Sequence, residues 1–333
     1  MRILITGGAG FIGHHFVEHL IKNTDWDIIV LDKLSYATPG FDRLRDVNCF
    51  LEKRVRCLTC DFTQPISPGI EKEIGQVDYI VHLGAETSVD KSITNPRPFV
   101  LSNVLGTMNV LEFAACQKNL RWFAMFSTDE VFGPAPPGVE YKEWSRYNCT
   151  NPYAATKAGA EQLALSYANT YGLPLFVINT MNVFGERQHP EKFIPKVINL
   201  VARRKPIIIH ADKTKKTPGS RFWIHARNVS GGLLFLLKNA VQRQRYNLVG
   251  EKEVNNLELA EFISRVLDIK ATYELVDFHS SRPGHDLRYA LDGKKMRDMG
   301  WKIDTTFEQS LEKTIKWYLE GANCRWLEEA QYV

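Results

Sequence analysis

Two groups of side chains near the middle of the chain could act together on one substrate. Residues 127–133 read Ser-Thr-Asp-Glu-Val-Phe-Gly, and residues 153–157 read Tyr-Ala-Ala-Thr-Lys. A phenol paired with an ammonium suits hydride chemistry on an alcohol, because the ammonium stabilises a phenolate that can serve as the base. Two adjacent carboxyl groups suit the removal of water, since one can take a proton while the other gives one. The sequence therefore predicts redox chemistry and dehydration in one pocket.

The phenol and the ammonium are spaced for one face of a helix. Tyr153 and Lys157 are four residues apart, and the Asn-Pro pair at residues 151–152 marks where the helix begins. A free tyrosine titrates near pH ~10. The ammonium and a positively charged nicotinamide ring would favour the phenolate, so Tyr153 is predicted to act as a base near neutral pH.

The acidic pair is expected at the end of a strand. Thr128, Asp129 and Glu130 follow an apolar run, and ligands bind at the carboxyl ends of strands in such sheets. Oxidation of a sugar at C4 would give both acids a role, because the C5 proton becomes acidic and the C6 hydroxyl can then leave. Adjacent carboxyl groups in a closed site push their pKa values apart, so that one stays protonated. The alternative is a helix N-cap or a solvated turn.

A glycine-rich segment near the amino terminus predicts a dinucleotide site. Residues 6–13 read Thr-Gly-Gly-Ala-Gly-Phe-Ile-Gly and lie between an apolar run and a helical pattern. Gly7 permits a tight turn, Gly10 lets the backbone approach a pyrophosphate, and Gly13 allows close packing of helix on strand. The free amides and the dipole of the helix amino terminus favour the anion.

The next apolar run ends in a carboxylate that suits a ribose. Asp32 lies about 20 residues after the glycines, at the spacing of the acidic residue that binds the adenosine ribose. A carboxylate accepts hydrogen bonds from a free 2′-hydroxyl and repels a 2′-phosphate, so the cofactor is predicted to be NAD rather than NADP, although Lys33 argues mildly against this. The predicted cofactor contacts are Gly7, Gly10, Phe11, Ile12, Gly13, Asp32, Lys33, Asp61, Phe62, Tyr153 and Lys157.

The elements that must position these residues follow a β-α-β rhythm. Near-continuous apolar runs, typical of a parallel sheet buried on both faces, predict strands at residues 2–6, 27–31, 54–58, 79–83, 122–126 and 175–179. Helical patterns lie between them, for example at 13–22 and 103–117. The fold class is therefore α/β, a Rossmann-type doubly wound parallel sheet with a smaller, interleaved carboxyl-terminal substrate domain. Residues 1–180 are expected to form the NAD-binding domain, with part of 221–250 returning to it, and 181–333 mainly the substrate domain.

The composition narrows the class of protein. The chain has 333 residues, 44% hydrophobic and 24% charged, with a formal net charge of +4. These values are ordinary for a globular protein and give no case for nucleic acid binding. No apolar run has transmembrane length, Met1 leaves no room for a signal peptide, and Cys57 and Cys60 lack a second pair with metal-ligand spacing. We expect a cytoplasmic protein with no metal site and no membrane contact.

The motifs together resemble a known family over nearly the whole chain. The chain is similar to extended short-chain dehydrogenase/reductases and, within them, to nucleotide-sugar 4,6-dehydratases. The Asp-Glu pair after Thr128 is the specific mark, because related epimerases lack it in this form. The other segments that carry the resemblance are 6–13, 32–36, 82–86, 151–157, 182–185, 190–195 and 282–289.

The resemblance implies a role for each catalytic residue. Tyr153 would take the proton of the C4 hydroxyl, supported by Thr128 and Lys157, while NAD takes hydride from C4 and returns it to C6. Glu130 would remove the C5 proton, and Asp129 would protonate the departing C6 hydroxyl. The product would be a nucleotide-linked 4-keto-6-deoxyhexose, and NAD would be regenerated and stay bound.

The resemblance also implies a nucleotide-sugar site and leaves its specificity open. Departures from the family pattern at Gly84, Asn179, 227–228 and 251–255 keep dTDP-glucose, UDP-glucose and UDP-N-acetylglucosamine all possible. Inversion at C5, a 4-epimerase and a non-enzymatic NAD-binding protein are the alternatives. A homodimer is implied through the helices near 101–117 and 152–170. The implied substrate-binding residues are Glu86, Asn103, Asn182, Glu191, Lys192, Arg221, Arg282 and His285, with Tyr289 beside the site.

Overall fold

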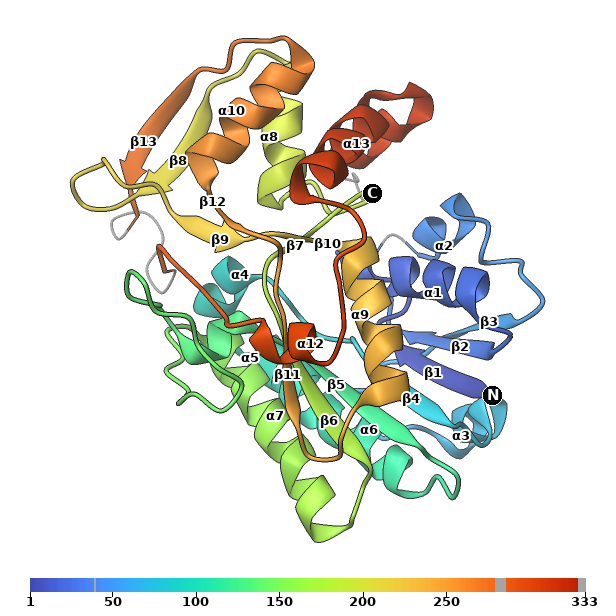
Figure 1. Cartoon of the computed structure of the whole chain (residues 1–333). Helices are drawn as coiled ribbons and strands as arrows, with labels where there is room; N and C mark the ends of the chain where they lie inside the picture. Colours follow the sequence, from blue (N-terminus) through green and yellow to red (C-terminus); the bar gives the residue numbers. More distant parts are fainter. Residues whose placement is uncertain (39, 279–285, 329–333) are drawn as a thin grey trace.

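A parallel seven-stranded sheet forms the larger unit of the chain (Figure 1). The computed structural model describes residues 1–38, 40–278 and 286–328. The strand order is β11-β6-β5-β4-β1-β2-β3, which continues the order of a dinucleotide-binding fold by one strand. The direction of winding reverses between β1 and β4, where such sheets bind their ligands. The strands are β1 (Arg2–Thr6), β2 (Asp27–Asp32), β3 (Val55–Thr59), β4 (Tyr79–His82), β5 (Trp122–Thr128), β6 (Leu175–Thr180) and β11 (Arg245–Leu248).

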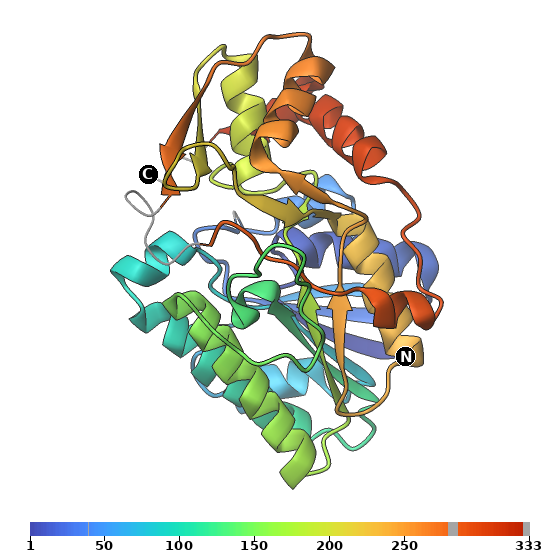
Figure 2. The same cartoon turned by 60° about the vertical axis from the view of Figure 1, so that its left-hand side comes forward.

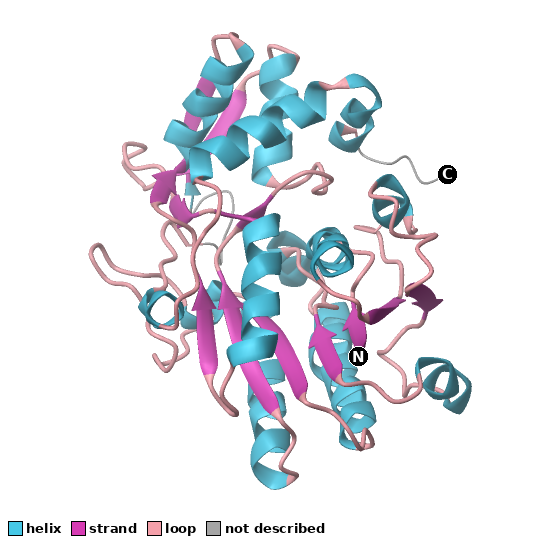
Figure 3. Cartoon of the chain, turned by 45° about the vertical axis from the view of Figure 1, so that its right-hand side comes forward, coloured by secondary structure: helices cyan, strands magenta, loops and turns pink. Residues whose placement is uncertain are grey.

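The sheet is covered on both faces because its strands are apolar on both sides. Figure 3 shows helices in front of and behind the strands. One face packs against α1 (Phe11–Asn23) and α9 (Ala226–Asn239), and the other packs against α3 (Pro68–Ile74), α6 (Gly106–Ala115) and α7 (Pro152–Thr170). Burying both faces in this way is the arrangement that continuous apolar strands predict. All six predicted strands are present, with bounds that shift by up to two residues.

One predicted helix differs in its local geometry. The pattern at 103–117 predicts a regular helix, whereas the chain forms a π-helix, η1 (Val100–Leu105), that continues into α6. A π-turn adds a residue to the helical repeat and is common near functional sites. Its buried Asn103 is directed at the loop after β4.

A smaller unit lies beyond the carboxyl ends of the strands (Figures 1 and 2). It has its own core, in which α8, α10 and α13 pack with β8 and β13, for example through Val197, Ile263 and Leu311. The chain returns from this unit to the sheet, because α9 packs on α1 and β11 pairs with β6. The elements here are β7 (Val183–Phe184), α8 (Phe193–Ala202), β8 (Ile207–Ala211), β9 (Ser220–Phe222), β10 (Ile224–His225), β12 (Glu253–Asn255), α10 (Asn256–Leu267), β13 (Tyr273–Asp277), α13 (Phe307–Leu319) and η3 (Gly321–Leu327).

The remaining short helices surround the junction between the two units. They are α2 (Asp42–Asp46), α4 (Val89–Thr94), α5 (Arg97–Phe99), η2 (Asp129–Phe132) and α12 (Lys294–Asp298). Within the described ranges, no helix is long and apolar enough to cross a membrane, and no group of three or more His, Cys, Asp or Glu residues is arranged to hold a metal ion. Cys57 is part of β3, and burial raises the pKa of its thiol to about 11.

A buried histidine ties β4 to its neighbours. His82 Nδ1 lies 2.7 Å from Thr6 Oγ1, and His82 Nε2 lies 3.0 Å from Thr107 Oγ1. Burial, with a smaller contribution from the charge of Lys157, lowers the pKa of His82 to about 3. The folded protein therefore keeps this imidazole neutral throughout the neutral and mildly acidic range.

The protein is expected to lose stability in acid because of His82. Between pH ~6.5, where a free histidine titrates, and pH ~3, the unfolded chain binds a proton that the folded chain does not. The free energy of unfolding should therefore fall by up to about 1.4 kcal/mol per pH unit from this residue. Urea unfolding at several pH values, compared between wild type and His82→Gln, measures the effect. Equal pH slopes in the two proteins would contradict it.

Candidate active site

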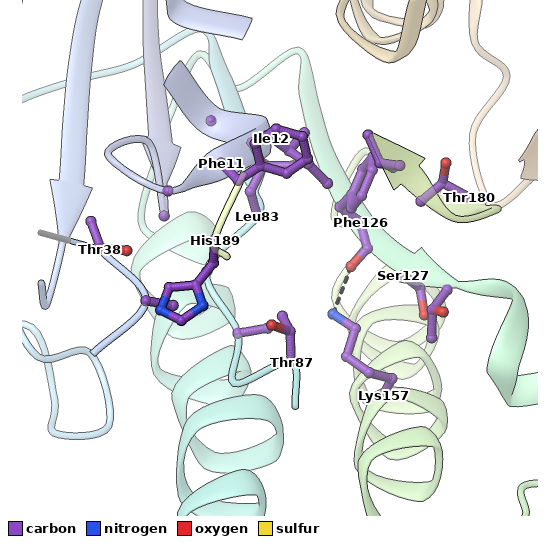
Figure 4. A pocket seen from close by; sticks show the side chains of 18 of the residues that line it. Phe11, Ile12, Thr38, Leu83, Thr87, Phe126, Ser127, Lys157, Thr180 and His189 are labelled. Carbon is purple, nitrogen blue, oxygen red and sulfur yellow. Dashed lines mark hydrogen bonds between the residues drawn. The ribbon is translucent and has the colours of Figure 1, made fainter. Parts of the chain in front are cut away.

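A cavity at the carboxyl ends of the central strands brings the predicted motifs together. It is lined by the glycine loop, by Asp32, by the segment from Ser127 to Glu130, and by Tyr153 and Lys157. Figure 4 shows Phe11 and Ile12 on one side of this cavity and Lys157 on the other. Residues far apart in the sequence therefore meet because every strand of the sheet points the same way.

The glycine loop has the geometry of a phosphate cradle. Gly7 has a φ of +69°, which favours glycine. A Cβ atom on Gly13 would lie 2.2 Å from the carbonyl oxygen of Gly7, and one on Gly10 would lie 3.0 Å from the same oxygen. The turn can therefore close tightly beneath the amino terminus of α1, where free amides and the helix dipole favour an anion.

Backbone amides hold the carboxylate of Asp32, the residue predicted to bind the ribose, and the neighbouring Lys33 is paired with a carboxylate. The carboxylate of Asp32 accepts hydrogen bonds from the backbone amides of Ala9 at 3.1 Å and Leu34 at 2.9 Å. Burial raises the pKa of Asp32, and these two amides oppose that shift. Lys33 pairs with Glu86 at 2.7 Å, so its ammonium is neutralised by a carboxylate. The mild argument for NADP that Lys33 provides is thereby weakened.

The two residues expected near an adenine differ in position. Asp61 accepts a hydrogen bond from the amide of Thr63 at 3.0 Å in an exposed turn. Phe62 is buried in the core and also lines the cavity. A Cβ atom on Gly84 would lie 2.5 Å from Cζ of Phe62, so this ring explains the glycine where the family commonly has alanine. Contact with an adenine remains a prediction for both residues.

The acidic pair is held by hydrogen bonds at the end of β5. The hydroxyl of Thr128 donates to Asp129 Oδ1 at 2.9 Å and accepts from the amide of Glu130 at 3.3 Å. The side-chain amide of Asn151 donates to Glu130 Oε2 at 3.1 Å. Asp129 is buried, and its Oδ2 has no hydrogen-bond partner among the described residues. A partly unpaired buried carboxyl in a cavity suits proton transfer to a ligand.

The two acids have different electrostatic neighbours. Burial, and then the charge of Glu130, raise the pKa of Asp129 to about 7. Burial also raises the pKa of Glu130, while the hydrogen bond from Asn151 and the charge of Arg221 oppose this. Because the negative charge of Glu130 helps to hold the proton on Asp129, the arrangement is compatible with the predicted roles of Asp129 as acid and Glu130 as base.

The phenol and the ammonium share the cavity, but the protein alone keeps the phenol neutral. Lys157 Nζ donates to the carbonyl oxygen of Phe126 at 2.7 Å (Figure 4), and burial lowers the pKa of Lys157 to about 8. Burial, followed by the charge of Glu130, raises the pKa of Tyr153 above its usual value, against a hydrogen bond with Thr128. The predicted phenolate therefore requires a neighbouring positive charge that outweighs burial and the charge of Glu130.

A second cavity adjoins the first on the side of the smaller unit. The two cavities share four lining residues: Thr87, Glu130, Asn182 and Lys192. The second cavity also contains Arg221, whose guanidinium donates to the carbonyl oxygens of Leu287 at 2.6 Å and Asp286 at 2.6 Å. A ligand that extends through both cavities would therefore pass beside the acidic pair.

The other predicted substrate residues are only partly at this cavity. Glu191 lines it and accepts a hydrogen bond from the hydroxyl of Tyr36 at 3.2 Å. The side chain of Asn103 instead binds the backbone of Glu86, at 2.8 and 3.1 Å, and the hydroxyl of Thr156 at 3.0 Å. Asn103 thus fixes the loop after β4 against α7. Arg282 and His285 lie outside the described residues.

Four side chains at the second cavity have buried polar atoms without a hydrogen-bond partner among the described residues. They are Asn182 Oδ1, Trp223 Nε1, Asn256 Oδ1 and the hydroxyl of Tyr289. The resemblance implied Asn182 and Tyr289 at or beside the site, but not the other two. Asn256 directly follows the segment 251–255, which departs from the family pattern, and Trp223 lies in an apolar run that is typical of core. An asparagine directly after the N-cap of a helix was the signal available for Asn256.

Fold and site together define the class of protein. A Rossmann-type sheet, a threonine at the end of β5 and a Tyr–Lys pair on α7 are those of an extended short-chain dehydrogenase/reductase. The chain belongs to the family of the GDP-mannose 4,6 dehydratase model, which matches residues 4–314.

Known relatives support this membership over nearly the full length. The dTDP-glucose 4,6-dehydratase of Salmonella typhimurium is 37% identical over 354 residues, covering 98% of this chain and 94% of that protein. The low-salt glycan biosynthesis protein Agl12 of Haloferax volcanii is 36% identical over 324 residues, covering 96% of this chain and 99% of that protein.

Solved structures agree with the fold. DesIV of Streptomyces venezuelae, a dTDP-glucose 4,6-dehydratase solved with NAD bound, has a TM-score of 0.88 and 34% identity, covering 98% of this chain and 99% of that one. The UDP-glucose 4-epimerase of Thermus thermophilus, also solved with NAD, has a TM-score of 0.84 and 25% identity, covering 97% of this chain and 100% of that one. The fold alone therefore does not separate dehydratase from epimerase.

Proposed function

We propose that this protein is an NAD-dependent nucleotide-hexose 4,6-dehydratase that gives a nucleotide-linked 4-keto-6-deoxyhexose. The observation that supports this most strongly is the pair of the buried Asp129 and the partly buried Glu130, held beside Thr128 where two cavities join. An epimerase needs no acid for a leaving hydroxyl, so the pair favours dehydration. The dTDP-glucose 4,6-dehydratase relatives make dTDP-glucose the first substrate to test, ahead of UDP-glucose and UDP-N-acetylglucosamine.

Each of the catalytic residues carries out a different step of the proposed reaction. NAD, when bound on the glycine loop and Asp32, supplies the hydride acceptor for C4 and the donor for C6. Tyr153 takes the proton of the C4 hydroxyl, assisted by Thr128. Glu130 takes the proton from C5, and Asp129 gives its proton to the C6 hydroxyl, which leaves as water. Glu130 then returns a proton to C5, after exchange with solvent, to complete the product. Each proton transfer is typically worth about 10²–10⁴ in rate.

The proposal is tested by the mass of the product. A panel of dTDP- and UDP-hexoses is incubated with the purified protein and analysed by mass spectrometry and NMR. We expect a product lighter by one water with at least one sugar, with no net change in NAD. Sugars of unchanged mass but inverted C4 would indicate the epimerase instead, and unchanged sugars throughout would contradict both.

Binding of NAD depends in this account on the carboxylate of Asp32. Asp32→Ala is expected to weaken NAD about 10–100-fold, because a hydrogen bond to a charged group contributes roughly 1.5–3 kcal/mol. Calorimetry on ligand-free protein with NAD and NADP measures both affinities, and Asp25→Ala, in the exposed loop between α1 and β2, is the control. Equal NAD affinity in wild type and Asp32→Ala would contradict the assignment.

We further propose that the protein is a cytoplasmic homodimer. Val100 and Leu101 expose apolar side chains on η1, next to the predicted pairing helices α6 and α7. All six cysteines are free, as expected in a reducing compartment. Sedimentation equilibrium tests the dimer. A monomer at micromolar concentration would contradict it.

A further inference from the structure

A buried carboxylate lies behind the catalytic residues and has no part in the mechanism above. Glu161 is on α7, four residues after Lys157 and eight after Tyr153, so the three side chains share one face of the helix. Glu161 has no exposed surface. An isolated buried charge is costly, so this carboxylate must be compensated by its neighbours.

Four side chains from outside α7 compensate it. Ser127 Oγ donates at 2.5 Å and Asn179 Nδ2 donates at 2.9 Å to Oε1 of Glu161. The hydroxyl of Tyr147 donates to Oε2, and Arg245 Nε lies 3.5 Å from the same oxygen. These contacts join β5, β6 and β11 to the catalytic helix through one side chain.

The same contacts hold the strand end that carries the acidic pair. Ser127 directly precedes Thr128, and the side-chain amide of Asn179 also donates to the carbonyl oxygen of Thr128 at 3.2 Å. A change at Glu161 would therefore move Thr128 relative to Lys157. A shift of this kind far from the reacting atoms can reduce a rate by about 10²-fold.

The two oxygens of this carboxylate have different neighbours. Asn179 contacts Oε1 of Glu161 as a neutral amide. The positive charge comes from Arg245 on β11, which lies at the other carboxylate oxygen. Burial raises the pKa of Glu161, but all four neighbours act to keep it charged.

The negative charge of Glu161 stabilises the protonated form of Lys157, four residues earlier on α7. Burial lowers the pKa of Lys157, and Glu161 is the group that opposes the shift. The other titratable groups close to Lys157 are His82 on β4, which is neutral, and Tyr153, Asp129 and Glu130, which line the same cavity.

We propose that Glu161, paired with Arg245 and bonded to Ser127 and Asn179, is a positioning residue that fixes the end of β5 against α7 and keeps Lys157 charged. This inference rests on the proposed function, because the charge of Lys157 is important for catalysis only if Tyr153 must lose a proton. It does not depend on the identity of the sugar.

The test measures the ionisation of Lys157 directly in ligand-free protein. Lysine labelled with ¹³C and ¹⁵N is followed by NMR across a pH titration, with Lys157→Arg used to assign the signal. Wild type should titrate near the pKa of about 8. In Glu161→Gln the pKa of Lys157 should fall by about one unit, since the two residues are four apart on one face of α7 and the variant removes a neighbouring opposite charge. The alkaline limb of the kcat profile should move with it, with little change in KM.

Two further variants separate charge from shape. Glu161→Gln/Arg245→Met removes both charges, and neutral replacement of a buried pair is often tolerated, so it covers the case in which the single variant does not fold. This double variant should show the same lowered pKa of Lys157. Tyr147→Phe removes one hydrogen bond but keeps the carboxylate, and should leave Lys157 unchanged. If Lys157 titrates as in wild type in both charge-removing variants, the inference is wrong, whatever sugar the enzyme uses.

Discussion

Glu130→Gln is expected to abolish exchange of the C5 hydrogen of the sugar with solvent. The amide keeps the shape of the side chain and the contact with Asn151, but it cannot take a proton. Formation of the dehydrated product should fall by about 10²–10⁴-fold, the usual contribution of a positioned base. The measurement is NMR of the sugar recovered from deuterium oxide, together with the rate of product formation.

Asp129→Asn is the matched control for this prediction. The C5 proton should still exchange, because Glu130 and the redox residues remain, while loss of the C6 hydroxyl is prevented. In wild type, dehydration should decline above pH ~7, since Asp129 must carry its proton and burial with the charge of Glu130 raises its pKa to about 7. Continued C5 exchange in Glu130→Gln would assign the base to another residue.

Tyr153→Phe is expected to stop the reaction at its first step. Without the phenol, the group assigned to take the proton of the C4 hydroxyl is lost, so no ketone forms and the C5 hydrogen never becomes acidic. Both product formation and C5 exchange should fall by about 10²–10⁴-fold, while the affinity for the nucleotide sugar stays the same.

Tyr167→Phe provides the control on the same helix. Tyr167 lies on α7 and packs against the hydrophobic core between α7 and the sheet. It does not line the cavity. The Tyr167→Phe variant should leave the rates of product formation and of C5 exchange unchanged. If Tyr153→Phe retained C5 exchange at the wild-type rate, the C4 ketone would have to form without this residue, and its role as base would be wrong.

The sequence predicted the parts of this molecule that depend on local pattern. Continuous apolar runs gave all six strands, and the glycine spacing gave the cradle beneath α1. The Tyr–Lys spacing placed both side chains in the cavity because a helix repeats its faces every four residues. In a parallel sheet, strand ends meet at one edge, so the acidic pair was also expected there.

Contacts between distant segments could not be predicted in the same way. The pairing of Lys33 with Glu86 depends on how the loops after β2 and β4 approach each other. The hydrogen bonds of Asn103 with the backbone of Glu86 depend on the π-turn of η1. The ion pair of Glu161 with Arg245 requires β11 to join the sheet beside β6, which no local pattern in either segment encodes.

The central claim is that a resident redox centre makes a short-lived ketone at C4 on which the acid–base pair acts. It is tested most directly with a nucleotide hexose that carries deuterium at C4. The account predicts that NMR of the product will find this deuterium in the methyl group at C6, with a solvent hydrogen at C5. Deuterium that stays at C4, or a C6 methyl group whose one new hydrogen comes from water, would contradict it.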